Sequence, residues 1–234
     1  EKFYQSEYLG QWLYGLPELP GQRGVLSATK RIAVPGCYPT AVTLALLPAF
    51  TAFLISGNDV VVVAASGTSG AGKSLKPQLL ASEIMGSASA YGVGGVHRHV
   101  PEILQNFRLL GAQQPALSFT PLLVPMSRGI LATCSAPLHP GVTVSDVRQA
   151  YEKAYFNEPF VTLLPEGVWP VTQSVVGSNA VHLQVTVDEA AKRLVAVSAI
   201  DNLTKGTAGG AIQSMNIALG LPESLGLPTA GVAP

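Results

Sequence analysis

Cys37 occupies a sequence position that favours a nucleophilic cysteine. It lies between a Pro-Gly pair, which stops regular structure, and a Tyr-Pro pair at the predicted start of an apolar helix. At the first turn of a helix, the helix dipole and unpaired backbone N–H groups favour thiolate over thiol. The position therefore favours an activated Cys37 with a low pKa, with a buried structural cysteine as the alternative. By contrast, Cys134 lies in the apolar run 130–136 and is expected to be an inert core residue.

Two histidines and an arginine, His97-Arg98-His99, occupy one loop directly ahead of a Pro-initiated helix. Imidazole is the side chain that most readily moves a proton near neutral pH, and Cys with a His base is a recurring arrangement for acyl transfer. Spacing does not separate His97 from His99, so both are candidates for the acid/base. The histidines and cysteines show no paired ligand spacing, so no metal site is predicted.

Two Gly-rich segments could contact a ligand. Residues 67–74 read GTSGAGKS, which satisfies the phosphate-loop pattern G-x-x-x-x-G-K-[ST] after an apolar strand. An ATPase of that kind also needs a series of parallel strand–helix–strand units and a later metal-binding Asp, which the sequence does not indicate. The favoured interpretation is a loop whose backbone N–H groups contact an anion or another ligand. The second segment is 201–213, where Asp-Asn after a strand leads into a Gly-rich helix start.

The elements that position these residues follow from hydrophobic patterning. Residues 30–34 predict a short strand, and residues 38–55 predict a helix buried between layers, with Pro48 tolerated or kinking. The β-branched run 60–65 predicts a strand covered on both faces. The first 35 residues contain no long periodic segment and are interpreted as a connecting arm.

Later elements complete an α+β pattern. Helices are predicted at 144–156, with Thr143 or Ser145 as N-cap, and at 207–219. Strands are predicted at 116–124, 130–136, 160–164, 181–187 and 194–199, the last two as a hairpin. The hairpin-like succession predicts an α+β fold with a largely antiparallel or mixed sheet.

Composition excludes several classes of protein. The 234 residues are 47% hydrophobic and 12% charged, with 14 Lys+Arg against 14 Asp+Glu. This balance gives no basic patch for nucleic acid or an anionic membrane, and the apolar content is too high for a disordered chain. The apolar stretch 41–55 is shorter than the roughly 20 residues that span a bilayer, and no signal peptide is recognisable. Two cysteines can form at most one disulfide, and a chain of this size does not need one. Both are therefore expected to be reduced thiols, which predicts a cytoplasmic location.

Together, the motifs resemble those of the N-acetyl-γ-glutamyl-phosphate reductase family of arginine biosynthesis, which is related to aspartate-semialdehyde dehydrogenase and more distantly to glyceraldehyde-3-phosphate dehydrogenase. The resemblance runs over nearly the whole chain in the family's order. It is carried by Tyr14-Gly15-Leu16-Pro17-Glu18, Pro35-Gly36-Cys37-Tyr38-Pro39-Thr40-Ala41, Ser66-Gly67-Thr68-Ser69-Gly70-Ala71-Gly72, His97-Arg98-His99-Val100-Pro101-Glu102, Ser127-Arg128-Gly129 and Asp201-Asn202-Leu203-Thr204-Lys205-Gly206.

The resemblance implies an NADP-dependent oxidoreductase that works through a thioester. Cys37 would attack an acyl phosphate, and His99, slightly favoured over His97, would manage the proton. Arg98 and Arg128 would bind substrate anions, although either could instead form a structural ion pair. Ser69, Gly70 and Asn202 would lie beside the nicotinamide, with helix capping as the alternative for Asn202. A homo-oligomer and a small-molecule substrate are the implied partners, with no nucleic acid, membrane or metal.

The sequence also departs from the family. No G-x-G-x-x-G or G-x-x-G-x-x-G turn precedes the Cys motif, so the N-terminal Rossmann domain is interpreted as absent. The resemblance then implies a glyceraldehyde-3-phosphate-dehydrogenase-like catalytic domain with helices on one face of its sheet. Residues 1–36 would be the end of the cofactor domain and a connecting arm, residues 37–204 the catalytic and oligomerisation domain, and residues 205–234 a helix returning to the cofactor domain and a tail. NADP(H) would be held mostly by the missing domain, so this chain alone is predicted to bind it weakly or not at all.

Three other functions compete with this interpretation. Aspartate-semialdehyde dehydrogenase shares the thioester chemistry but acts on a smaller, unacetylated substrate. A non-catalytic dimerisation or scaffold module would keep the fold without the chemistry. A phosphate-loop ATPase is disfavoured for the reasons given above.

Overall fold

The computed structural model describes residues 10–72 and 76–232 of the chain. The helices and strands in chain order, with short 3₁₀ turns named η1 to η3 and a π-helical turn named η4, are β1 (Leu13–Tyr14), α1 (Gln22–Leu26), β2 (Ile32–Ala33), α2 (Cys37–Thr51), β3 (Val60–Ser66), η1 (Thr68–Ala71), η2 (Pro77–Leu79), α3 (Ala81–Ile84), β4 (Ser89–Ala90), α4 (Val100–Leu109), β5 (Leu117–Leu123), β6 (Ile130–Pro137), α5 (Val144–Tyr155), β7 (Val161–Leu163), η3 (Thr172–Val175), β8 (Val181–Asp188), β9 (Arg193–Ile200), η4 (Thr204–Ala208) and α6 (Gly209–Ala218).

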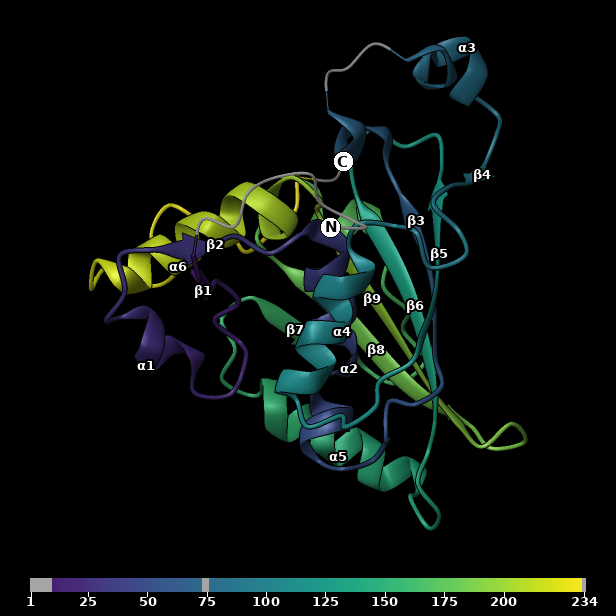
Figure 1. Cartoon of the computed structure of the whole chain (residues 1–234), viewed down its shortest axis with the longest axis vertical. Helices are drawn as coiled ribbons and strands as arrows, with labels where there is room; N and C mark the ends of the chain where they lie inside the picture. The colour runs from purple at the N-terminus through teal and green to yellow at the C-terminus, as the bar shows by residue number, and fades with distance from the viewer. Residues whose placement is uncertain (1–9, 73–75, 233–234) are drawn as a thin grey trace.

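A seven-stranded sheet in the order β4-β5-β3-β6-β9-β8-β7 forms the body of the chain (Figure 1). Its β3–β5 and β7–β8 neighbours are parallel and the other pairs are antiparallel. The predicted α+β fold with a mixed sheet is confirmed, as is the β8–β9 hairpin. The β3-to-β5 crossover, which contains α4, is one parallel strand–helix–strand unit, but β6 on the other side of β3 is antiparallel. Within the described residues, the parallel series of a phosphate-loop ATPase is therefore not found.

Helix α2 is buried because the sheet and two neighbouring helices pack against it. Its residues from Tyr38 to Phe50 are all buried, against the sheet, α4 and α5. Pro48 has no N–H to donate to the carbonyl of Leu44 one turn earlier. The Tyr155 hydroxyl on α5 donates to that carbonyl instead. Pro48 is thus tolerated inside α2 because a neighbouring helix supplies the missing donor.

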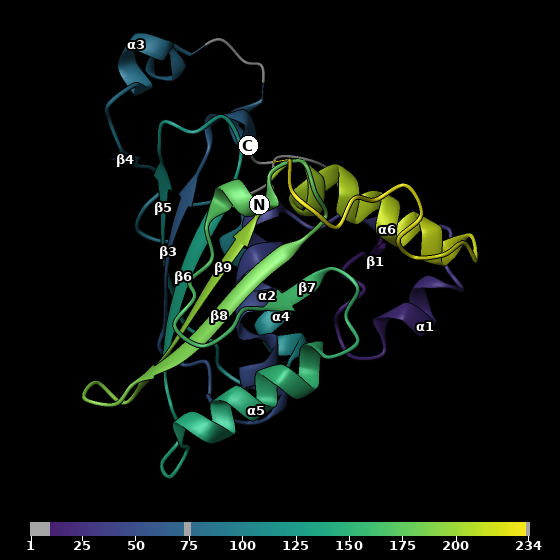
Figure 2. The ribbon, with the colours of Figure 1, turned by 180° about the vertical axis from the view of Figure 1, so that it is seen from behind.

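The helices α2, α4 and α5 lie on one face of the sheet, as predicted, and Figure 2 shows the sheet from its other side. The expectation that β3 is covered on both faces is wrong. Val60, Val62 and Ala64 are buried under the helices, whereas Val61 and Val63 are 37% and 40% exposed. Because all three helices occupy one side, the β-branched run gives β3 an apolar stripe on the uncovered face.

Other predicted elements occur with shifted ends. The helix predicted at 38–55 ends at Thr51 and the one predicted at 207–219 is α6, preceded by η4. The N-cap of α5 is Thr143, which forms a capping box with Asp146. The arm contains the short helix α1, which was not predicted. Among the described residues, no helix is both long and apolar enough to cross a membrane.

Candidate active site

Cys37 is the first residue of α2, and Gly36 is the N-cap. Burial raises the pKa of the Cys37 thiol, and the backbone N–H groups at the helix start and the charge of Arg98 oppose that effect only in part. The prediction of a low pKa is therefore wrong. The helix start is present, but burial outweighs it, so ionisation of Cys37 needs a base.

The π-helical turn η4 packs directly on Cys37. A Cβ placed on Gly206 would lie 2.7 Å from the Cβ of Cys37 and 3.1 Å from its Cα. Only glycine permits so close an approach of the two backbones. The segment after the Asp-Asn pair thus forms one wall of the cysteine site, and this contact contributes to the burial of the thiol.

His99 lies on the other side of the helix start. It is the N-cap of α4, and its Nε2 lies 2.7 Å from the position that a Cβ would take on Gly36, next to Cys37 in the chain. Burial, with the charges of His97 and Arg98, lowers the pKa of His99 to about 3. The ring is therefore neutral near neutral pH, so a ring nitrogen is available to accept a proton, although a pKa this low disfavours a stable imidazolium.

His97 is held in an aromatic cluster. Its ring packs edge-on against Tyr38, Tyr91 and Phe119. Its Nδ1 accepts a hydrogen bond of 3.1 Å from the backbone N–H of His99. Burial followed by the charge of Arg98 lowers the pKa of His97. These contacts hold His97 against the aromatic cluster and the backbone of His99.

The two candidate anion-binding arginines differ. The Arg98 charge influences the pKa of Cys37, His97 and His99, which puts this guanidinium within electrostatic reach of all three. Arg128 forms a salt bridge of 2.9 Å with buried Asp201 and donates to Thr204 Oγ1 at 2.9 Å. Of the two roles predicted for Arg128, the ion pair is the one formed in this structure.

Asn202 joins the two Gly-rich segments. Its Nδ2 donates to Ser69 Oγ at 3.0 Å, and its Oδ1 accepts from the backbone N–H of Gly129 at 2.7 Å. A Cβ on Gly70 would meet the Asn202 amide only at 3.6 Å. Ser69, Gly70 and Asn202 are thus brought together, and the Asn202 side chain bridges loops instead of capping a helix. Lys73 and Ser74 of the phosphate-loop pattern lie outside the described residues.

Two carboxylates beside the site were not predicted, Glu18, which is buried, and Glu102, which is half-buried. Glu102 Oε1 accepts hydrogen bonds from the Gly36 N–H and the Tyr14 hydroxyl, both at 2.8 Å. Glu18 Oε1 pairs with the ammonium of Lys205 at 2.6 Å, immediately before Gly206 in the chain. Both carboxylates belong to the motifs that carry the family resemblance, but the partners of each lie 66 to 187 residues away in sequence. Local spacing gives no signal for such contacts.

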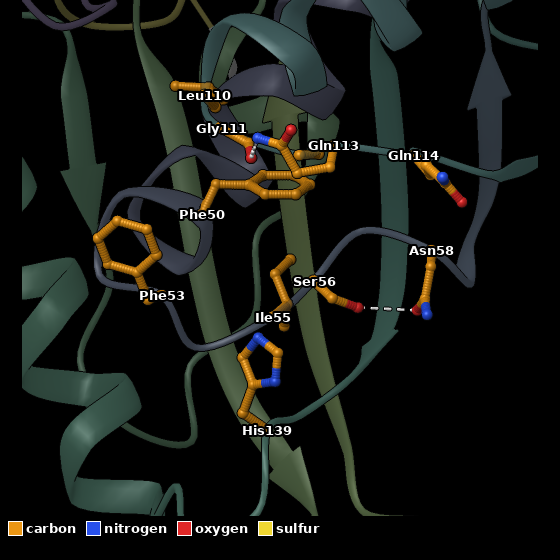
Figure 3. Close-up of a pocket in the computed structure, with 11 residues that line it drawn as sticks. Phe50, Phe53, Ile55, Ser56, Asn58, Leu110, Gly111, Gln113, Gln114 and His139 are labelled. Atoms are coloured by element: carbon orange, nitrogen blue, oxygen red, sulfur yellow. Dashed lines mark hydrogen bonds between the residues drawn. The ribbon is translucent and has the colours of Figure 1, made fainter.

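Two cavities differ in their distance from Cys37. One of about 330 Å³ borders Glu102 and is lined also by Trp12, Tyr14 and Val34. Another of about 360 Å³ lies at the far end of α2, roughly 20 Å along the helix from Cys37. Figure 3 shows that Phe50, Phe53 and His139 line this second cavity, which contains none of the predicted site residues. Within the described part of the chain, no three His, Cys, Asp or Glu side chains form a potential metal site.

Comparison with known proteins gives the chain its family. A family model described as "Semialdehyde dehydrogenase, dimerisation domain" matches residues 37–202. N-acetyl-gamma-glutamyl-phosphate reductases of Streptomyces avermitilis and Thermobifida fusca are 67% and 66% identical to it; each match covers all of this chain and 68% of the relative. The crystal structure of aspartate semialdehyde dehydrogenase II from Vibrio cholerae shares the fold, with a TM-score of 0.69 at 16% identity over 87% of this chain and 67% of that one. The resemblance inferred from the motifs is confirmed: the chain belongs to the N-acetyl-gamma-glutamyl-phosphate reductases of the semialdehyde dehydrogenase family.

Proposed function

We propose that this chain carries the acyl-transfer machinery for the NADPH-dependent reduction of N-acetyl-γ-glutamyl phosphate to the semialdehyde, a step of arginine biosynthesis. The observation that carries the proposal is the position of Cys37 at the start of α2, with the neutral His99 beside Gly36, the residue that precedes it. The high identity to reductases of that name over the whole chain supports the choice of substrate.

The chemistry begins with proton transfer from the Cys37 thiol to His99. The sulfur attacks the acyl carbon, the bond from that carbon to the phosphate oxygen breaks, and inorganic phosphate leaves a thioester on Cys37. NADPH, when bound, supplies the hydride that reduces this thioester. The imidazolium of His99 then protonates the thiohemiacetal oxygen, and collapse of the thiohemiacetal releases the aldehyde and the thiol.

His99 is the proposed acid/base instead of His97. Its Nε2 lies beside Gly36, whereas His97 uses Nδ1 to hold the His99 backbone and packs its ring among aromatic residues. His97 would then support the loop. For the substrate anion, we propose Arg98 as the nearer guanidinium, with Arg128 acting through its ion pair to Asp201.

For the cofactor, the described residues fit only the nicotinamide end. The bonded pair of Ser69 and Asn202, with Gly70 beside it, offers polar groups to an amide-bearing ring. The chain has no G-x-G-x-x-G turn for the pyrophosphate. We therefore propose that residues 1–36 adjoin a cofactor domain, that residues 37–204 form the catalytic and oligomerisation domain, and that residues 205–234 return toward the cofactor domain.

The proposed assembly is a homo-oligomer formed through the uncovered face of the sheet. Val61 and Val63 of β3 share this face with Val195 and Val197 of β9, and Thr133 and Ser135 of β6 lie between the two valine pairs. This partly apolar face is opposite the helices, and the matched family model is named as a dimerisation domain. Burying such a face against a second copy would remove apolar surface from water.

The proposed function is tested by the release of inorganic phosphate in a single turnover, which needs no hydride. On mixing with N-acetyl-γ-glutamyl phosphate, the wild-type chain is expected to release one phosphate per Cys37. Cys37→Ser should abolish this release, whereas Cys134→Ala, in the buried core of β6, should retain it. Release by Cys37→Ser at the wild-type rate would refute the proposal.

A further inference from the structure

We propose that Glu102 is a positioning residue for Cys37, holding the turn from which α2 begins; this inference rests on the function proposed above. Glu102 stands in the first turn of α4, where a glutamate commonly reaches back to its own helix N-cap. Here α4 has no side-chain cap, and the carboxylate reaches across to the N-cap of α2 instead.

The contact is made to the backbone that leads into Cys37. Glu102 Oε1 accepts the N–H of Gly36, and Gly36 is the residue whose carbonyl accepts the first hydrogen bond of α2, from the N–H of Thr40. A backbone N–H bonded to a carboxylate makes one of the stronger hydrogen bonds in proteins. Glu102 thus fixes the peptide immediately before the nucleophile.

A closed set of hydrogen bonds holds Glu102 in place. The Tyr14 hydroxyl donates to the same Oε1 at 2.8 Å and itself accepts from Asn106 Nδ2 at 2.9 Å. Asn106 Nδ2 also donates to Thr43 Oγ1 on α2 at 2.8 Å. The set therefore starts at the N-cap of α2 and returns to α2 two turns later, which locks α2, α4 and β1 together at the site.

Glu102 also stands beside the proposed base. The position that a Cβ would take on Gly36 lies 2.7 Å from His99 Nε2 and 3.1 Å from Glu102 Oε2. Both groups belong to the start of α4, and both therefore lie close to the Cα of Gly36. The charge of Glu102 also contributes to the raised pKa of Cys37, so its two effects are separable: the hydrogen bonds position the cysteine and the charge opposes its ionisation.

The test separates the two effects with two variants. Glu102→Gln keeps an oxygen that accepts from Gly36 and Tyr14 but loses the charge, whereas Glu102→Ala loses both. The exposed Glu189, in the β8–β9 turn, provides the matched control Glu189→Gln. The readouts are the pH dependence of iodoacetamide labelling at Cys37 and single-turnover phosphate release, with urea unfolding to confirm that each variant folds.

The pKa of Cys37 is expected to fall in Glu102→Gln, because a nearby negative charge is removed, and phosphate release should stay within about threefold of wild type. Glu102→Ala should release phosphate about 100-fold more slowly, the effect of a misplacement of about 1 Å. The pKa of Cys37 in Glu102→Ala should lie above the pKa of Cys37 in Glu102→Gln, because the start of α2 is no longer held in place. Glu189→Gln should match wild type in both measurements.

Equal Cys37 pKa values in the two Glu102 variants would overturn the proposal, as would wild-type phosphate release by Glu102→Ala. If the wild-type chain releases no phosphate while labelling still separates the variants, the proposed function fails and the positioning role stands. Should Glu102→Ala not fold, Tyr14→Phe removes one of the two donors to Oε1. Tyr14→Phe should slow phosphate release, as Glu102→Ala does, but by less; an unchanged rate in Tyr14→Phe would count against the proposal.

Discussion

Two carboxylates hold segments that pack around the start of α2: Glu18 is buried and Glu102 is half-buried, and their surroundings differ. Glu18 faces a full positive charge, because the ammonium of Lys205 lies 2.6 Å away and Gln213 Nε2 donates to the same oxygen. Glu102 faces neutral donors, a backbone N–H and a tyrosine hydroxyl, with the charge of Arg98 as a weaker influence. Glu18 pairs with Lys205, which precedes the Gly206 that packs on Cys37, and Glu102 accepts from Gly36, which precedes Cys37.

The pKa values of the two carboxyl groups move in opposite directions. Burial opposes ionisation of Glu18, but the charge and hydrogen bond of Lys205 outweigh it and lower the pKa. Burial of Glu102 is only partly offset by its hydrogen bonds from Gly36 and Tyr14, so its pKa is raised. The charge of Lys205 holds Glu18 in its ionised form, whereas the hydrogen bonds to Glu102 do not compensate fully for its partial burial. Glu102 is the one next to the nucleophile.

The largest effect is expected from removing the partner of Glu18. Lys205→Met leaves the fully buried carboxylate without a counter-charge, which should lower the free energy of unfolding by about 3–5 kcal/mol. Urea unfolding at neutral pH measures it, with the exposed Lys153→Met as control. The double variant Glu18→Gln/Lys205→Met should recover much of the loss. A Lys205→Met protein as stable as wild type would contradict the account of this pair.

The next largest effect is expected at Gly36, on the Glu102 side. Gly36→Ala places a Cβ 2.7 Å from His99 Nε2 and 3.1 Å from Glu102 Oε2, so both groups must shift. Phosphate release should slow about 100-fold, since misplacement by about 1 Å has that effect. Gly24→Ala in α1, where a Cβ meets nothing within 4 Å, is the control. Equal rates for the two variants would show that the close approach does not matter.

The smallest effect tests the comparison itself, through the pH dependence of stability. The pKa of Glu18 is lowered by folding, so its ionisation stabilises the fold above its unfolded pKa, and that contribution is lost as pH falls through the folded pKa. The pKa of Glu102 is raised by folding, so its contribution is present below the unfolded pKa and lost as pH rises through the folded pKa.

Stability relative to wild type should therefore change with opposite sign in Glu18→Gln and Glu102→Gln. On raising the pH from about 4 to about 7, Glu18→Gln should lose stability against wild type and Glu102→Gln should gain it. Each change should be on the order of 1 kcal/mol, because a tenfold change in proton affinity corresponds to about 1.4 kcal/mol. Urea unfolding of the three proteins at both pH values measures the two differences. Trends of the same sign would contradict the assignment of the two environments.

The sequence predicted what local chemistry determines. The Pro-Gly stop before Cys37 predicted the start of α2, and the polar segment 188–193 between the last two predicted strands predicted the β8–β9 hairpin. The sequence did not predict the raised pKa of Cys37, because burial of that thiol depends on Gly206. The fold brings Gly206 next to Cys37 although the two are far apart in sequence. The exposed stripe of Val61 and Val63 was missed for a similar reason: a β-branched run does not reveal on which face the helices pack.

The site was predicted best where one loop carries the groups. His97, Arg98 and His99 are adjacent in sequence, so their proximity needed no fold. The roles within the loop did need it, since the approach of His99 to Gly36 and the packing of His97 against Tyr38 and Phe119 are set by tertiary structure. Glu102 belongs to the same motif, yet its partner Gly36 lies 66 residues away, and nothing local indicates that contact.

The central claim is that Cys37 is the nucleophile that becomes acylated. The most direct measurement is mass spectrometry of the wild-type chain quenched soon after mixing with N-acetyl-γ-glutamyl phosphate, without NADPH. We expect an N-acetylglutamyl adduct on the peptide that carries Cys37, equal in amount to the phosphate released, and none on the peptide that carries buried Cys134. Phosphate release without an adduct on Cys37, or an adduct on another residue, would contradict the account.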